Sequence, residues 1–339
     1  MKGTVYLGER EVEVRDFPKP HPQPGEVVVA MKAAGLCGSD LHKYCNTREW
    51  AAEREGMISG HEPAGIVVEL GQNVTNVSVG DRVSVYHSLG CGHCVHCLGG
   101  EPVFCDEEGA FGRTRDGCHA DFMSTPSQYC LPLPEEFSFP VGAMLACTAG
   151  TAFASLRKLP CEHGDTLVVF GLGPVGLTCL LMGSATGLHC IGVEVNDYRL
   201  QLAGRLGAKT LVNAHDIDPV KAILDLTHGK GAAGVIECSG NAGARRQTVD
   251  AAATHASIIL VGAGADELSF DPLLVMHKEL TIRGNAVYSM PAYFEAIHFL
   301  QTNPLPLDEM VTHRFPIEEA LRAFDEFSSG NTGKVIFEW

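Results

Sequence analysis

Hydrophobic and polar positions follow one pattern in the first 150 residues of the chain and another pattern after them. In the first part, short runs of β-branched and apolar residues are separated by turn sequences such as Pro-Gly and Val-Gly-Asp. The runs at 26–31, 65–70, 81–86 and 120–125 have the length and composition of β-strands. Strands and turns without helical periodicity predict a strand-rich, barrel-like domain.

After Cys147, strand-like apolar runs alternate with helical patterns. The predicted strands are 166–170, 190–195, 210–212, 233–237 and 257–261, and the predicted helices include 197–206 and 244–253. Because parallel strands need crossover connections, this alternation predicts a doubly wound parallel sheet of the Rossmann type, so the fold class is α/β. The alternation ends after Gly284, where two amphipathic helices (291–302 and 317–327) and a last strand (334–337) are expected.

The stretch 166–193 contains no Asp, Glu, Lys or Arg and is long enough to span a bilayer. Six glycines and Pro174 interrupt it, however. Gly and Pro mark turns and helix starts, so we expect a strand, a turn, a helix and a second strand here rather than a membrane span.

Charge and cysteine content narrow the possible partners and the compartment. The 339 residues include 41 acidic and 25 basic ones, a net charge of −16. A surplus of this sign repels nucleic acids and anionic membranes, so neither is expected as a partner. The 13 cysteines are an odd number in a long chain, and no apolar segment follows Met1. We therefore expect a cytoplasmic protein with reduced thiols rather than a disulfide scaffold.

A glycine-rich turn at the end of the strand 166–170 is a candidate dinucleotide site. Its residues form the pattern G-x-G-x-x-G: Gly171, Leu172, Gly173, Pro174, Val175 and Gly176. Such glycines allow a tight turn, close approach of a pyrophosphate, and packing of the helix that follows. Glu194 ends the next predicted strand. A carboxylate at this position binds the adenosine ribose of NAD and repels the 2′-phosphate of NADP. Arg199, one helical turn later, is expected to cover the same ribose. This pattern predicts NAD rather than NADP.

Four cysteines at short spacing predict a zinc site in the segment 88–108. They are Cys91, Cys94, Cys97 and Cys105. Four thiolates complete a tetrahedral shell, so this zinc is expected to be structural, with no position for a substrate. The alternative, a zinc ribbon that binds nucleic acid, conflicts with the negative charge of the chain.

Three other segments carry residues able to bind a metal. Cys37, Ser39 and His42 lie close together, His61 and Glu62 open a predicted strand, and Cys147 stands where the second pattern begins. Spacing alone does not bring these segments together. Taken singly, each cysteine has the properties of a small buried hydrophobe and each histidine those of a loop residue.

Taken together, these motifs resemble the zinc-dependent medium-chain alcohol dehydrogenases over essentially the whole chain, in particular the branch that acts on polyols, threonine and secondary alcohols. The resemblance implies a catalytic zinc held by Cys37, His61 and Cys147, with Glu62 as an exchangeable ligand or adjacent carboxylate. It also implies that Ser39 takes the proton of the alcohol and passes it through the cofactor ribose to His42. Hydride would pass between the substrate and NAD(H), and the chain would form a homodimer or homotetramer.

The resemblance also implies a division of the chain into two domains. A catalytic domain is expected at 1–148 and 288–339, with the structural zinc lobe at 88–108, and the dinucleotide-binding domain at 149–287.

The substrate is less well defined than the reaction. Gly38 after the first ligand is typical of enzymes for secondary alcohols, whereas a cysteine at position 147 is typical of enzymes for simple alcohols. His87 and Trp50 are candidate substrate-pocket residues, and Arg245 and Arg246 are expected to be solvated charges. We expect oxidation of a secondary or polyhydroxylated alcohol to a ketone. The alternatives are a primary or aryl alcohol dehydrogenase, a zinc-free quinone reductase relative, and an NAD-sensing or structural protein.

Overall fold

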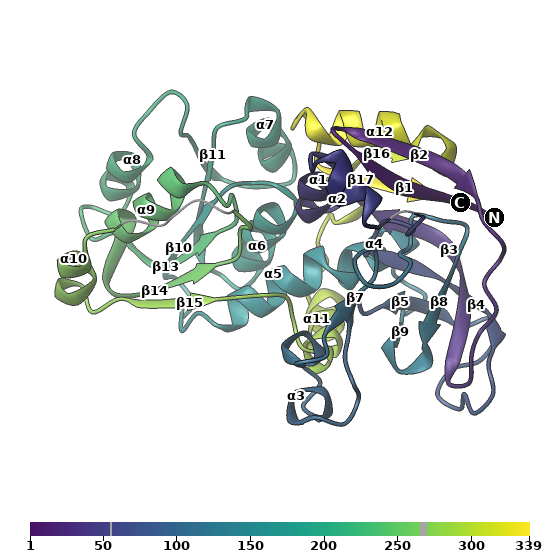
Figure 1. The fold of residues 1–339 in the computed structure, drawn as a ribbon. Helices are drawn as coiled ribbons and strands as arrows, with labels where there is room; N and C mark the ends of the chain where they lie inside the picture. The colour runs from purple at the N-terminus through teal and green to yellow at the C-terminus, as the bar shows by residue number, and fades with distance from the viewer. Residues whose placement is uncertain (55, 265–269) are drawn as a thin grey trace. The chain divides into compact units, whose positions relative to one another are not determined.

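The structure is a computed structural model that describes residues 1–54, 56–264 and 270–339 (Figure 1). The chain divides into two compact units. The first contains Met1–Gly150, Ser289–Glu295 and Val311–Trp339, and the second contains Thr151–Tyr288 and Ala296–Met310. The chain therefore passes from one unit to the other after residues 150, 288, 295 and 310. Within the second unit, Phe299 packs on Phe153 with ring centroids 5.7 Å apart.

A seven-stranded sheet forms the centre of the first unit. Its order is β16-β17-β3-β4-β5-β9, and β8 also pairs with β3. The strands are β3 (Glu26–Gly35), β4 (Pro63–Leu70), β5 (Arg82–Val85), β8 (Phe122–Pro126), β9 (Cys130–Pro132), β16 (Val311–Phe315) and β17 (Lys334–Glu338). All pairs are antiparallel except β16 with β17. The strands predicted in this part of the sequence are confirmed as β3, β4, β5 and β8.

Smaller elements complete the first unit. They are β1 (Lys2–Gly8), β2 (Glu11–Asp16), β6 (Ser88–Leu89), β7 (Gly109–Ala110), α1 (Gly38–Tyr44), α2 (Arg48–Ala52), α3 (Val95–Leu98), α4 (Phe139–Ala146) and α12 (Ala320–Ser328). Short 3-10 helices occupy Pro102–Phe104, Ser127–Tyr129 and Ile317–Glu319. The predicted helix 317–327 is thus a 3-10 turn followed by α12.

The second unit is built on a six-stranded parallel sheet with the order β12-β11-β10-β13-β14-β15. Its strands are β10 (Thr166–Phe170), β11 (His189–Glu194), β12 (Thr210–Asn213), β13 (Ala232–Glu237), β14 (Ala252–Leu260) and β15 (Thr281–Gly284). The helices are α6 (Pro174–Ala185), α7 (Asp197–Arg205), α8 (Pro219–Leu226), α9 (Ala242–Ala251) and α10 (Pro272–His277), with a 3-10 turn at Asp308–Met310. Two further helices, α5 (Thr148–Arg157) and α11 (Met290–Thr302), begin at residues of the first unit and end at residues of the second. The doubly wound sheet predicted from the sequence is confirmed.

The central strands β10, β11 and β13 are largely buried on both faces, as is usual for parallel sheets, whereas the edge strand β15 is mostly exposed. Val168, Phe170, Val235 and Ile258 are each exposed by no more than 1 % and form one core cluster. The chain winds from β10 toward β12 in one direction and from β13 toward β15 in the other. The strand order therefore reverses between β10 and β13, and ligands of such sheets bind at that point, outside the carboxyl ends of the strands.

The end of α9 differs from the sequence prediction. The helix was expected to reach residue 253, but it ends at Ala251 and Ala252 begins β14. The ammonium of Lys278 donates hydrogen bonds to the carbonyl oxygens of Val249, Asp250 and Ala252, at 3.1, 2.9 and 2.7 Å. A cation that satisfies the last carbonyls of a helix stabilises its end there.

In the described part of the chain, no single helix has both the length and the apolar character of a membrane span. The pair α4 and α5 reaches both criteria only when its two helices are counted together, and it is bent by 53°.

Candidate active site

The structure brings together Cys37, His61, Glu62 and Cys147, which the sequence could not join by spacing. Cys37 precedes α1, His61 and Glu62 precede β4, and Cys147 follows α4. One ligand atom from each residue lies within 4.8 Å of the others. Two thiols, an imidazole and a carboxylate at this separation fit a zinc ion.

The protonation of the two thiols also suits a metal. The hydrogen bond from the Cys147 thiol is the main cause that holds the pKa of Cys37 well below its usual value, although burial acts to raise it. A hydrogen bond from His61 and the charge of His61 lower this pKa further. The same contact, together with burial, raises the pKa of Cys147. Cys37 therefore gives up its proton more readily than Cys147, and zinc would displace thiol protons on binding because it binds thiolates.

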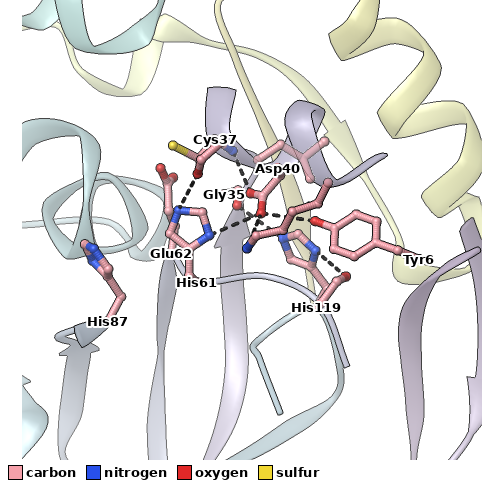
Figure 2. Close-up of polar contacts among 12 residues, drawn as sticks. Tyr6, Gly35, Cys37, Asp40, His61, Glu62, His87 and His119 are labelled. Carbon is pink, nitrogen blue, oxygen red and sulfur yellow. Dashed lines mark hydrogen bonds and ion pairs between the residues drawn. The ribbon is translucent and has the colours of Figure 1, made fainter. Parts of the chain in front are cut away.

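Asp40 orients His61 and was missed by the sequence interpretation. Its Oδ1 lies 3.2 Å from His61 Nδ1 (Figure 2). Nε2 of the same ring lies 3.4 Å from the Ser39 hydroxyl. This arrangement leaves Nε2 as the ligand atom, because a ligating histidine commonly gives its other nitrogen to a carboxylate. The spacing of Cys37 and Asp40 was the available signal, since an acidic residue at the third position of a helix can form a capping box.

Asp40 is completely buried and is stabilised as a carboxylate. It accepts hydrogen bonds from the Tyr6 hydroxyl and the Cys37 amide, both at 3.0 Å, and its Oδ1 lies 3.5 Å from the Lys43 ammonium. Burial acts to raise the pKa of Asp40, but the charges of His61 and Lys43 and the hydrogen bond to His61 hold it well below its usual value. In return, the Asp40 charge raises the pKa of His61 to about 10 in the metal-free protein, against the effect of burial.

Lys334 and Thr148 hold the Glu62 carboxylate. The Lys334 ammonium is paired with Glu62 Oε2, and the Thr148 hydroxyl donates to Oε1 at 3.1 Å. Lys334 also donates to the Leu36 carbonyl at 2.9 Å and to the Thr148 hydroxyl at 3.0 Å. All three side chains are buried. No pattern in the sequence pointed to Lys334, because it enters the site from the last strand of the chain.

Ser39 and His42 both lie on α1, one helical turn apart. The Ser39 hydroxyl is half-buried beside His61, and His42 is exposed to solvent one helical turn later. Residues three apart on a helix lie on one face. One face of α1 therefore carries a hydroxyl beside the cluster and, one turn later, an exposed imidazole.

The two candidate pocket residues lie in different surroundings. His87 is buried 5.4 Å from the His61 ring, its Nδ1 bonds the Ala146 carbonyl at 2.9 Å, and burial lowers its pKa to about 4, so its ring is neutral. Trp50 packs 6.3 Å from the Tyr6 ring and beneath the Arg54 guanidinium. The cavity that borders Trp50 has a volume of about 10 Å³, and this cavity is too small for an organic substrate.

The four cysteines of the lobe converge on a second centre. The sulfur atoms of Cys91, Cys94, Cys97 and Cys105 lie within 4.8 Å of one another. Backbone amides of Cys91, Cys94, Cys97 and Glu107 each donate to one of these sulfurs at 3.4 Å. Amide donors stabilise thiolate charge, so this donor set fits a closed zinc site.

The glycine turn has the geometry of a phosphate-binding site. Gly171 follows β10 with φ of +84°, which favours glycine, and Gly173 precedes α6. A Cβ atom on Gly176 would lie 1.9 Å from the Gly171 carbonyl oxygen, so the turn packs tightly there. A Cβ on Gly173 would meet only Arg199 Nη1, at 4.0 Å. The first amides of α6, which have no partner within the helix, thus lie beside a cation, which fits a pyrophosphate.

Glu194 connects this turn to the start of α7. Its Oε2 accepts from the Leu172 amide at 2.8 Å, and its Oε1 accepts from the amides of Val195 and Asn196 at 2.8 and 3.1 Å. Arg199 Nη1 lies 3.8 Å from Glu194 Oε2. The buried Nε of Arg199 has no hydrogen-bond partner among the described residues. A carboxylate oxygen accepts two hydrogen bonds, so Oε2 keeps one site for a ribose hydroxyl.

Comparisons with known proteins agree with this geometry. Residues 23–135 match the alcohol dehydrogenase GroES-like domain, and residues 174–302 match the zinc-binding dehydrogenase family. The chain is 34% identical to the uncharacterized zinc-type alcohol dehydrogenase-like protein YphC of Escherichia coli (strain K12), over 99% of this chain and 98% of that protein. It is also 34% identical to L-threonine 3-dehydrogenase of Pyrococcus abyssi (strain GE5 / Orsay), over 99% and 97% of the two chains. A solved NAD-dependent alcohol dehydrogenase matches all of both chains with a TM-score of 0.88 and 27% identity.

The chain therefore belongs to the zinc-dependent alcohol dehydrogenase family. It is an oxidoreductase that binds zinc and a nicotinamide dinucleotide and acts on the CH–OH group of a small-molecule alcohol. The family and the enzyme class predicted from the sequence are confirmed.

Proposed function

We propose that the protein oxidises a secondary or polyhydroxylated alcohol to a ketone, reversibly, with NAD as the hydride acceptor. The convergence of Cys37, His61, Glu62 and Cys147, with the Ser39 hydroxyl 3.4 Å from His61, carries this proposal. The relatives named L-threonine 3-dehydrogenase support the substrate class, since carbon 3 of threonine bears a secondary hydroxyl.

Cys37, His61 and Cys147 are the proposed ligands of the catalytic zinc, which supplies a Lewis acid that lowers the pKa of the substrate hydroxyl. Asp40 fixes the orientation of His61. Lys334 and Thr148 hold Glu62 beside the cluster, where its carboxylate can approach the metal or withdraw to its two partners. Cys91, Cys94, Cys97 and Cys105 hold a second, structural zinc.

The proton of the alcohol leaves through α1. The Ser39 hydroxyl is placed to accept it beside the cluster, and His42 is placed to deliver it to solvent. Histidine suits this exit because its ordinary pKa lies near neutral pH. We propose that Gly171, Leu172, Gly173, Pro174, Val175 and Gly176 hold the dinucleotide phosphates. Glu194 selects NAD, since its buried carboxylate repels a 2′-phosphate.

The neutral, buried ring of His87 supports a polar substrate. Because Nδ1 donates to the Ala146 carbonyl, Nε2 is the acceptor nitrogen of this neutral ring. Trp50 stays a prediction from the sequence, because the cavity that borders it in this structure is too small for an organic substrate. We further propose a cytoplasmic homodimer or homotetramer, whose subunit number an elution or light-scattering mass would test.

A dinucleotide-reduction screen tests the proposal. The purified protein is assayed with NAD and with NADP against polyols, 3-hydroxy amino acids, simple secondary alcohols, primary alcohols and aryl alcohols, with S39A as the control for the proton path. We expect the highest kcat/KM with NAD and a secondary alcohol. A preference for a primary or aryl alcohol would instead support the second candidate function, which Cys147 favours because a cysteine there is typical of enzymes for simple alcohols.

A further inference from the structure

Two loops beside the glycine turn pack against it at the carboxyl ends of β10, β13 and β14. They are 238–241, after β13, and 261–264, after β14. A Cβ on Gly171 would lie 2.8 Å from Ser239 Cα, and a Cβ on Gly240 would lie 2.2 Å from the Ala263 carbonyl oxygen. The backbones of the three segments are therefore in direct contact, and a shift of one loop displaces the next.

Glu237, the last residue of β13, connects the two loops. Its Oε1 accepts from the amides of Ser239 and Gly240 at 2.7 and 2.9 Å. Its main-chain carbonyl accepts from the amides of Val261 and Gly262, both at 2.9 Å. The side chain has no exposed surface. Glu237 thus fixes the first loop through its carboxylate and the second through its backbone.

Arg245 on α9 completes the connection. Its Nε lies 3.6 Å from Glu237 Oε2, and its Nη2 and Nη1 donate to the carbonyls of Gly262 and Gly264 at 2.7 and 3.3 Å. Only 11% of its side chain is exposed. The expectation that Arg245 is a solvated charge is therefore wrong, because β14 and its loop cover one side of α9, whereas the adjacent Arg246 is exposed.

The sheet order indicates which half of a dinucleotide these loops face. Glu194 places the adenosine ribose at the end of β11, and the start of α6 places the pyrophosphate at the end of β10. The remaining half of the molecule must then extend over the neighbours on the other side of β10, which are β13 and β14. The loops held by Glu237 and Arg245 lie at the ends of these two strands.

We propose that Glu237 and Arg245 are positioning residues for the nicotinamide half of the dinucleotide, which they act on through the loops 238–241 and 261–264. The inference rests on the proposed use of NAD. Each residue is the charge partner of the other in a buried setting, so removal of one leaves the other uncompensated. The pair therefore holds the loops in one arrangement, and its loss affects the ligand half that contacts them.

Binding of two ligands to the zinc-loaded protein tests the proposal. NADH contains both halves of the dinucleotide, whereas ADP-ribose lacks the nicotinamide ring. Dissociation constants for both are measured by calorimetry for the wild type, R245A, the double variant E237Q/R245A, and R246A as a matched control on the same helix. The double variant leaves no uncompensated charge, so it keeps the test possible if R245A does not fold.

We expect R245A and the double variant to bind NADH at least tenfold more weakly than the wild type does. Their dissociation constant for ADP-ribose should change less than twofold. In turnover assays, KM for NAD should rise by a larger factor than kcat falls. R246A should match the wild type for both ligands. If both ligands bind more weakly by the same factor, the substitutions loosen the domain in general. If the affinity for NADH is unchanged, the loops do not need the pair. Either result overturns the inference. A wild-type protein that binds neither ligand would contradict the proposed use of NAD itself.

Discussion

Lys334 forms an ion pair with Glu62 in which neither side chain is exposed to solvent. Burial raises the pKa of Glu62 and the Lys334 charge opposes this rise, with a net value of about 7. Burial lowers the pKa of Lys334, but the charges of Glu62 and Cys37 raise it above its ordinary value. Gly35 makes room for the pair, since a Cβ there would lie 2.2 Å from Glu62 Oε2. The last strand of the chain thereby supplies a charge to the metal-binding cluster.

Substitution of Lys334 by methionine should destabilise the first unit, because it leaves the Glu62 carboxylate buried without its counter-charge. Removal of one partner of a buried pair costs about 3 to 5 kcal/mol. Urea unfolding of zinc-loaded protein measures the change. The double variant E62Q/K334M should recover most of the loss, and a K334M protein as stable as the wild type would contradict the assigned role of the pair.

Asp40→Asn should weaken zinc binding at the catalytic cluster and leave the lobe zinc unaffected. The substitution keeps the size of the side chain but removes the charge that orients His61. Loss of such a partner typically lowers metal affinity about 10- to 100-fold. Release of zinc to a chromophoric chelator measures the affinity, with the lobe zinc as an internal control. Identical release curves for variant and wild type would argue against the orientation of His61 by Asp40.

Metal analysis should find two zinc ions per chain. Cys105→Ser should remove one of them and reduce the stability of the fold, because Cys105 closes the four-thiolate lobe. Cys37→Ser should remove the other and abolish hydride transfer with a smaller effect on unfolding. The division between the two sites fails if the C105S protein folds normally and loses only its activity.

Glu194→Ala should reduce the preference for NAD over NADP. The substitution removes the buried carboxylate that we propose repels a 2′-phosphate, and it leaves Arg199, whose Nη1 lies 3.8 Å from Glu194 Oε2, beside the vacated position. It also removes hydrogen bonds to Leu172, Val195 and Asn196, so KM should rise for both cofactors. The measurement is therefore kcat/KM with NAD divided by kcat/KM with NADP, a ratio that should fall at least tenfold. An unchanged ratio would show that Glu194 only supports the turn.

His119 should make the fold sensitive to acid. It is buried between the Ser59 hydroxyl at 2.9 Å and the Gly35 carbonyl at 3.2 Å, and burial lowers its pKa from 6.5 to about 4. Between these two values the unfolded chain binds a proton that the folded chain does not, so stability falls as the pH falls. One such histidine costs about 2 kcal/mol between pH 7 and pH 5. Urea midpoints over this range should depend less on pH in H119N than in the wild type, whereas H277N, at an exposed position, should keep the full dependence.

The local elements of the fold were largely predictable. The alternation of strands and helices after Cys147 led directly to the parallel sheet, because period and composition reflect which positions are buried in each element. Residues joined by short spacing were also predictable. The four cysteines of the lobe lie within one short segment, 91–105, and the glycines from Gly171 to Gly176 lie in one turn, so neighbouring residues largely determine where they are placed.

The sequence by itself determined which segments form strands and helices and which residues have the chemistry to bind zinc or a phosphate. Only the tertiary structure placed Asp40 on His61, Lys334 on Glu62 and Arg245 on Glu237. These contacts pair charges whose own sequence surroundings look like those of ordinary surface residues. A buried charge is stable only beside its partner. Whether a charge is buried depends on how distant strands and helices pack, and no local pattern records that packing.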